Sequence, residues 1–146
     1  MKTMIIYKST HQGNTRKIAE AMAKAINADI VDASKAIDIS GYGLIGFGSG
    51  IYAFKHHAAL LKLADSIDGK GKKAFVFSTS GTGEKKYHSN LIKKLKQRGF
   101  EIKGEFSCKG LDKFGPLALF GGINKGKPDK EDIKKAEEFA KSLVKK

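Results

Sequence analysis

A polar segment near the N-terminus, residues 9–15, has the composition of a phosphate-binding loop. It follows the apolar run 4–7 and precedes apolar residues at helical spacing. Unpaired N–H groups and the helix dipole at a helix start bind anions, and a glycine lets the phosphate approach the backbone. The residues of this predicted monophosphate site are Ser9, Thr10, His11, Gln12, Gly13, Asn14 and Thr15.

Other readings of this segment remain open or can be excluded. It lacks the glycine-lysine-hydroxyl ending of a Walker loop and the spacing of the GxGxxG dinucleotide fingerprint. Arg16 and Lys17 fall within the predicted helix, so the loop itself would hold a phosphate mainly through neutral donors. A polar loop that only caps the helix is the alternative.

Two more polar, glycine-rich segments follow predicted strands. The first comes after the strand at 42–47, and its candidate binding residues are Ser49, Gly50, Ile51 and Tyr52. The second comes after the strand at 73–77, and its candidates are Ser78, Thr79, Ser80, Gly81, Thr82, Gly83 and, slightly later, Tyr87. Three such segments along one chain predict one composite site if the fold brings them together.

The elements that must position these segments alternate between strand and helix. Short apolar runs predict strands at 4–7, 30–31, 42–47, 73–77 and 100–108. Helical periodicity predicts helices at 18–26, with Asn14 or Thr15 as cap, at 58–67, around 91–95, and from Pro128 onward. The inward face of the last helix is predicted to be Ile133, Ala136, Phe139, Ala140, Leu143 and Val144.

This alternation predicts an α/β fold with a doubly wound, five-stranded parallel sheet. Right-handed crossovers would place helices on both faces and give the strand order 2-1-3-4-5. Ligands of such sheets bind outside the carboxyl ends of the strands, where the strand order reverses. The three polar segments leave the ends of strands one, three and four, so we expect them to converge there.

Length and composition restrict the class of protein. The 146 residues predict one domain, 1–146. No apolar run is long enough to span a membrane, and the apolar stretch at the start of the sequence is too short to be a signal peptide. We therefore expect a cytoplasmic protein. The net charge is +13, yet Arg16 and Arg98 are the only arginines and aromatic residues do not alternate with basic ones. A nucleic-acid reader is therefore disfavoured, and a lysine-covered surface that meets acidic partners is favoured.

Histidines, the cysteine and a long loop are further candidates for chemistry. The adjacent His56 and His57 lack a nearby acidic cluster, so we expect them to be solvated or to support the site indirectly, and no metal site is predicted. Cys108, the only cysteine, is expected to be a small buried side chain. The loop 109–127 is rich in glycine and apolar residues and is expected to pack on the molecule or form a partner surface. A receiver-type signalling module is excluded because 7–9 supplies no acidic cluster.

The three segments together resemble the flavodoxin family. Residues 10–15 resemble its loop for the phosphate of FMN, with Gln12 where the family usually has threonine; 48–52 resembles its first flavin loop and 78–83 with Tyr87 its second. Residues 106–110 and 121–126 resemble a short-chain subgroup common in anaerobes. The resemblance implies FMN as cofactor, with Tyr52 or alternatively Tyr87 stacking on the ring and Gly50 facing flavin N5.

The resemblance also implies a function, with one alternative and one departure. It implies a low-potential electron carrier that serves other redox proteins. An FMN-dependent oxidoreductase on the same fold, such as a quinone or protoporphyrinogen reductase, is the alternative, so enzyme activity stays undecided. Familiar flavodoxins are acidic whereas this chain is basic, so we expect its redox partners to present acidic surfaces.

Overall fold

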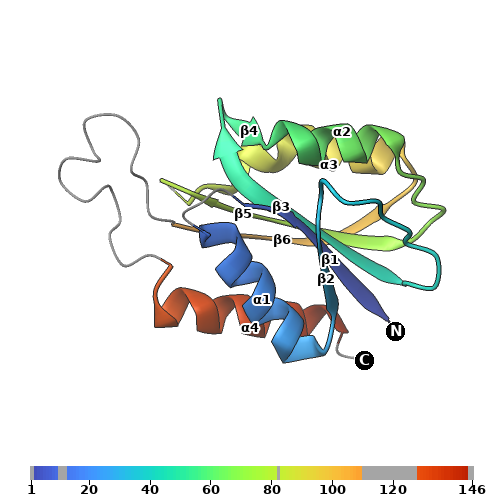
Figure 1. The fold of residues 1–146 in the computed structure, drawn as a ribbon. Coiled ribbons are helices and arrows are strands. Elements are labelled where there is room, and N and C mark those ends of the chain that lie inside the picture. Colours follow the sequence, from blue (N-terminus) through green and yellow to red (C-terminus); the bar gives the residue numbers. More distant parts are fainter. Residues whose placement is uncertain (1, 10–12, 82, 110–127, 145–146) are drawn as a thin grey trace.

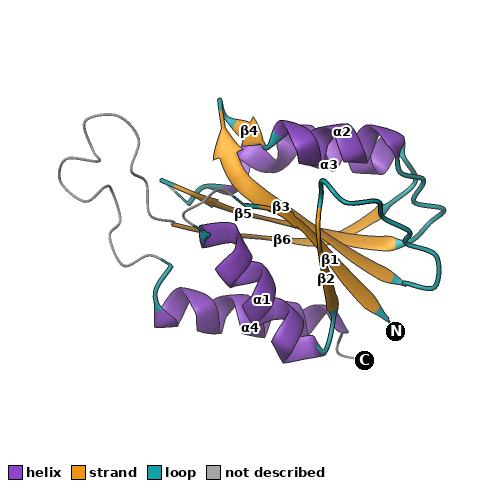
Figure 2. Cartoon of the chain, viewed as in Figure 1, coloured by secondary structure: helices purple, strands orange, loops and turns teal. Residues whose placement is uncertain are grey.

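The chain folds into a central sheet between two layers of helices (Figures 1 and 2). The computed structural model describes residues 2–9, 13–81, 83–109 and 128–144. The strands are β1 (Thr3–Lys8), β2 (Asp29–Asp32), β3 (Leu44–Tyr52), β4 (Lys55–His56), β5 (Lys73–Ser80) and β6 (Glu101–Lys109). The helices are α1 (Asn14–Ile26), α2 (Ala58–Ser66), the 3-10 turn η1 (Lys85–His88), α3 (Ser89–Gln97) and α4 (Lys130–Val144).

The parallel sheet has the predicted doubly wound topology. Its order is β2-β1-β3-β5-β6, and β4 is an additional strand that pairs antiparallel with β3. Strand β1 pairs with β2 on one side and β3 on the other, so the strand order reverses at β1. Two of the three polar segments border that reversal: the first follows the carboxyl end of β1, and the second forms the carboxyl end of β3.

Each face of the sheet carries its own apolar core. On one face α2 and α3 pack over side chains such as Phe47 and Val76. On the other face α1 and α4 pack over Phe75 and Phe77 (Figure 1). Successive residues of β5 therefore serve opposite faces, as the alternation of side chains along a strand requires. The predicted inward face of α4 is confirmed, since all six residues belong to the second core.

The N-cap of α1 precedes both residues that were predicted to cap it. Asn14 and Thr15 lie inside the helix, and Gly13 is the N-cap, with a left-handed φ of 71°. This conformation costs glycine little because it has no Cβ, and it turns the chain sharply into the helix. At the other end Asn27 is the C-cap, in the left-handed conformation with φ 55°.

Two predicted loops are in large part strands. β3 continues through 48–52 and β5 continues to Ser80, because Gly48, Ser49 and Gly50 still pair with Phe77, Ser78 and Thr79 in parallel register. Glycine and serine have low strand propensity, so the sequence favoured loops there. Pairing on both sides of β3 outweighs that propensity. Among the described residues, no helix is long and apolar enough to cross a membrane.

Candidate functional site

The three predicted segments meet at the carboxyl edge of the sheet. Thr15, in the first turn of α1, and Thr79, at the end of β5, share a hydrogen bond of 2.9 Å between their Oγ1 atoms. Both residues are buried, and 64 positions separate them in the chain. The helix that follows the first segment is therefore joined directly to the third. Strand β3, which carries the second segment, lies between β1 and β5.

The start of α1 suits an anion. Its first turn contains no acidic residue, and its glycine N-cap offers no side chain to occupy the first N–H groups. Ser9 Oγ accepts a hydrogen bond of 3.3 Å from the N–H of Arg16. The helix dipole and neutral donors at this point match the predicted phosphate site. The predicted residues Thr10, His11 and Gln12 lie outside the described residues, as does Thr82 of the third segment.

The side chains of Ser49 and Ser78 point away from α1, toward the α2 and α3 layer. Ser49 Oγ accepts a hydrogen bond from the N–H of His57 at 2.9 Å and donates to the carbonyl of Gly50. Ser78 Oγ lies 2.6 Å from His88 Nε2. Both serines are fully buried. Their hydroxyl groups hold the two segments in place from the α2 and α3 side. Only the backbone groups of these two serines are therefore available to a ligand at the carboxyl edge.

His88 was not predicted as part of the site, yet it connects three elements. Its Nδ1 donates to Glu105 of β6 at 3.0 Å, and its Nε2 then accepts the hydroxyl proton of Ser78. Burial, with a smaller effect of Lys85, lowers the pKa of His88 to about 4, so its imidazole is neutral at pH 7. Serine, histidine and carboxylate in this order resemble a hydrolytic triad, but Ser78 is fully buried, so no substrate can reach it.

Of the two roles expected for His56, the solvated one is wrong, because the short strand β4 turns its ring inward, where it contacts the backbone of β5. The side chain is 1% exposed, and its Nε2 lies 3.0 Å from the carbonyl oxygen of Phe77, to which it donates. Its Nδ1 has no hydrogen-bond partner among the described residues. Burial, with a smaller effect of the nearby His88, whose ring centroid is 5.0 Å away, lowers the pKa of His56 to about 4 against the opposing effect of the hydrogen bond to Phe77.

His57 has a different role, as the N-cap of α2. Its Nδ1 accepts a hydrogen bond of 2.9 Å from the N–H of Ala59.

Cys108 is buried, as predicted. Within the described ranges, no group of three histidine, cysteine or acidic side chains could hold a metal ion.

Aromatic side chains from two segments lie at the outer rim. Tyr52 ends β3 with 38% of its surface exposed, and its ring meets His57 edge-on at 5.1 Å between centroids. A Cβ added to Gly50 would lie 3.1 Å from Tyr52 Oη, so the tyrosine covers that glycine. Tyr87 of η1 instead packs against Phe54, with centroids 5.7 Å apart. Phe54 carried no sequence signal because the hairpin that displays it was not predicted.

The third segment is held in place by further hydrogen bonds. Ser80 Oγ accepts from the N–H of Gly83 at 2.8 Å, and Ser107 Oγ donates to the carbonyl of Gly83 at 2.7 Å. The adjacent Gly81 is half-buried, as is Ile51 of the second segment. The turn after β5 is thereby fixed against β6.

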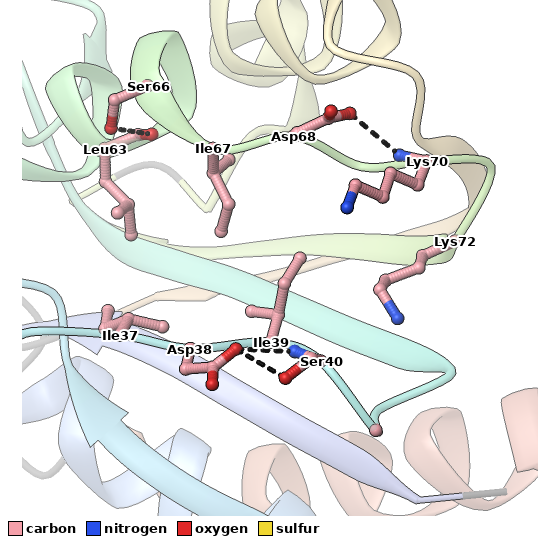
Figure 3. A pocket seen from close by; sticks show the side chains of 11 residues that line it. Ile37, Asp38, Ile39, Ser40, Leu63, Ser66, Ile67, Asp68, Lys70 and Lys72 are labelled. Atoms are coloured by element: carbon pink, nitrogen blue, oxygen red, sulfur yellow. Dashed lines mark hydrogen bonds between the residues drawn. The ribbon is translucent and has the colours of Figure 1, made fainter.

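A cavity of about 480 Å³ lies at the other end of the sheet (Figure 3). Its lining comes from the segments that precede β3 and β5, including Ile39, Ile67 and Lys70. The carboxylate of Asp38 there accepts from the N–H and hydroxyl of Ser40. Because ligands of doubly wound sheets bind at the carboxyl ends of the strands, this cavity is separate from the candidate site.

Comparison with known proteins places the chain in a family. A family model described as "Flavodoxin domain" matches residues 4–123. An uncharacterized protein of Methanocaldococcus jannaschii is 52% identical over 149 residues, which cover 99% of each chain.

Solved structures agree with this assignment. Oxidised Flavodoxin 2 from Bacillus cereus is 20% identical, with a TM-score of 0.74 over 99% of this chain and 98% of that one. A flavodoxin from the domain Archaea is 16% identical, with a TM-score of 0.68 over 99% and 96%. A flavoprotein in complex with FMN from Lactobacillus acidophilus is 21% identical, with a TM-score of 0.60 over 71% and 91%. With the family match over most of its length and a flavodoxin-like fold, the chain belongs to the flavodoxin family.

Proposed function

We propose that the protein binds FMN at the carboxyl edge of the sheet and carries electrons between redox proteins. The observation that carries this proposal is the meeting of three polar segments there, with α1 and β5 joined by the hydrogen bond between Thr15 and Thr79. The similar flavoprotein from Lactobacillus acidophilus was solved in complex with FMN, which supports the choice of cofactor.

In this proposal each group of residues has a distinct task. The start of α1, with Ser9 and Thr15, binds the phosphate through neutral donors and the helix dipole. Tyr52, with Tyr87 as the alternative, supplies aromatic surface for the ring, and the backbone of Gly50 lies close beneath Tyr52. When bound, FMN supplies one-electron redox chemistry, and the protein determines its position and electrostatic surroundings.

An electron carrier and an FMN-dependent reductase differ in how fast they turn over a small-molecule substrate such as a quinone. The 480 Å³ cavity lies at the opposite end of the sheet and belongs to neither activity. A stepwise reductive titration with visible spectra tests the proposal. Two resolved one-electron steps with little turnover on quinones support a carrier, whereas rapid turnover on a quinone or protoporphyrinogen supports the reductase alternative.

Replacing Asn14 and Thr15 together by alanine should weaken FMN binding far more than riboflavin binding. The two ligands differ only in the phosphate, and loss of hydrogen bonds to a charged group costs roughly 1.5–3 kcal/mol, which is tenfold or more in affinity. Fluorescence titration of both ligands measures the difference. Thr15→Ser keeps the hydroxyl and serves as the control; equal losses for FMN and riboflavin would remove the phosphate from this loop.

Replacing Tyr52 by alanine should change the flavin absorption spectrum and weaken FMN by about 1 kcal/mol, because stacked aromatic pairs contribute about that much. Spectra, redox potentials and binding are measured on the same variant. Tyr52→Phe keeps the ring and should resemble the unmodified protein. If Tyr52→Ala leaves all three quantities unchanged, Tyr87 becomes the stacking candidate.

A further inference from the structure

A strip of lysines begins at the candidate site and continues along one helix. Residues 85–97, which form η1 and α3, contain five lysines and no acidic residue. Helix α4, on the opposite face of the sheet, balances four lysines against four acidic residues (Figure 1). The positive charge of the chain is therefore concentrated on the α3 side relative to α4.

Several lysines of this strip have no counter-charge in the described part of the chain. Lys85, Lys93 and Lys96 are exposed and form no ion pair with a described carboxylate. Lys94 pairs with Asp65 at 2.9 Å, and Lys86 with Glu84 at 3.2 Å. Uncompensated charges on one surface attract an oppositely charged macromolecule and orient it during approach.

An exposed aromatic pair lies where the strip begins. The side chain of Phe54 is 77% exposed, and its ring contacts Tyr87, which belongs to η1. The ammonium of Lys86 lies 5.3 Å from the centroid of the Tyr87 ring. Aromatic residues are enriched at the centres of protein interfaces, so aromatic rings at the start of a lysine-rich segment favour a protein partner.

Phe54 lies in a turn whose backbone conformation is unfavourable for its residue type. Tyr52 and Lys55 pair across the β3 and β4 hairpin, which leaves Ala53 and Phe54 as its two loop residues. Both have positive φ, 51° and 66°, which suits glycine or asparagine and is unfavourable for a bulky side chain. Apart from its contact with Tyr87, the ring lies in water in the described part of the chain, and a strained turn that exposes an apolar ring points to a contact with another molecule.

We propose that Phe54, Tyr87 and the lysines of 85–97 form the docking surface for an acidic redox protein, with Phe54 entering an apolar recess of that partner. This inference rests on the proposed function, because the surface adjoins the segments assigned to the flavin. A partner seated there lies next to those segments. The lysines accelerate the approach, and the aromatic ring slows dissociation.

The test uses the full chain, both as purified and after addition of FMN, and a fluorescently labelled acidic ferredoxin as probe, with binding read by anisotropy at low and high salt. Replacing Lys85, Lys93 and Lys96 by glutamate should weaken binding about tenfold or more at low salt and remove its salt dependence. The matched control replaces the exposed Lys130, Lys134 and Lys141 of α4 by glutamate, with the same change in net charge. It should weaken binding far less.

Phe54→Gly separates docking from folding. Glycine relieves the positive φ, so the midpoint of thermal unfolding should rise while ferredoxin binding weakens about tenfold at every salt concentration. A structural role for the ring would lower both quantities together. Phe54→Tyr keeps the ring and should bind like the unmodified protein.

Other results overturn the proposal. Equal losses in the α3 and α4 variants would show a general charge effect, and tighter binding of a 20-base-pair DNA duplex or of anionic phosphatidylserine vesicles than of ferredoxin would name another partner. Anisotropy does not require electron transfer. If the purified chain binds no flavin while the α3 and Phe54 variants behave as expected, the function proposed above fails and the docking surface stands.

Discussion

Lowering the pH from 6.5 to 4 is expected to reduce the free energy of unfolding by about 3 kcal/mol for each of His56 and His88. Their pKa is 6.5 as an unperturbed histidine and about 4 in the folded chain. The folded state therefore binds fewer protons than the unfolded chain in this interval. The stability that the neutral rings provide is complete above pH 6.5 and is lost as the pH falls toward 4.

Other titrating groups contribute less in this interval. The pKa values of Asp32 and Asp38 are lowered from 3.8, so their effects fall below pH 4. Burial also lowers the pKa of His57, but this side chain is only half-buried, so solvent screens its effect. The two fully buried rings are thus expected to account for most of the slope.

Urea unfolding at several pH values measures this effect. Replacing either His56 or His88 by glutamine should reduce the slope between pH 6.5 and 4 by about half, because each variant removes one titrating ring. His57→Gln is the matched control, since it removes an adjacent histidine and should change the slope little. A free energy of unfolding that stays constant from pH 6.5 to 4.5 would contradict the prediction, because it would mean that folding does not lower the pKa of either ring.

Gly48→Ala is expected to destabilise the protein by about 3 kcal/mol, the upper part of the range for overpacked cores. A Cβ at Gly48 would overlap the ring of Phe77, and one at Gly46 would overlap the ring of Phe75. Both rings are fully buried beneath α1 and α4, so neither can move aside without shifting a helix. The strand that would be displaced leads directly into Ser49 and Tyr52.

A double-mutant cycle identifies the cause. Phe77→Leu should restore part of the stability lost in Gly48→Ala, because a smaller side chain makes room for the added methyl group. Gly104→Ala on β6 is the control: its Cβ would meet Phe139 at 3.1 Å, and that ring is only half-buried, so it can yield. Thermal or urea unfolding supplies the free energies. A loss for Gly48→Ala no larger than for Gly104→Ala would contradict the steric argument.

The strand order and the convergence of the three segments were predictable from the sequence. Buried strands such as β1 and β5 are continuous apolar runs, and helices such as α1 have clear apolar periodicity. These signals are local, and the handedness of crossovers then leaves few topologies. The contact of Thr15 with Thr79 follows from that topology, although neither residue alone indicates the other.

The remaining features depend on tertiary contacts. The ring of His56 is buried only because β4 folds back on β3, and two paired residues, Lys55 and His56, are too short to give a periodic signal. His88 becomes part of the site through Ser78 and Glu105, which are 10 and 17 residues away. Neutral, buried histidines and an exposed phenylalanine each contradict residue-type averages, so sequence patterns could not predict them.

The short antiparallel pair of β3 and β4 has a consequence for the entropy of chain closure. Every parallel pairing of this sheet joins strands separated by a crossover, so each requires a long loop to close before its contacts form. The pairing of Tyr52 with Lys55 closes over two residues only. Closing the turn that presents Phe54 therefore costs little chain entropy. A substitution in this turn should have little effect on how the parallel strands assemble.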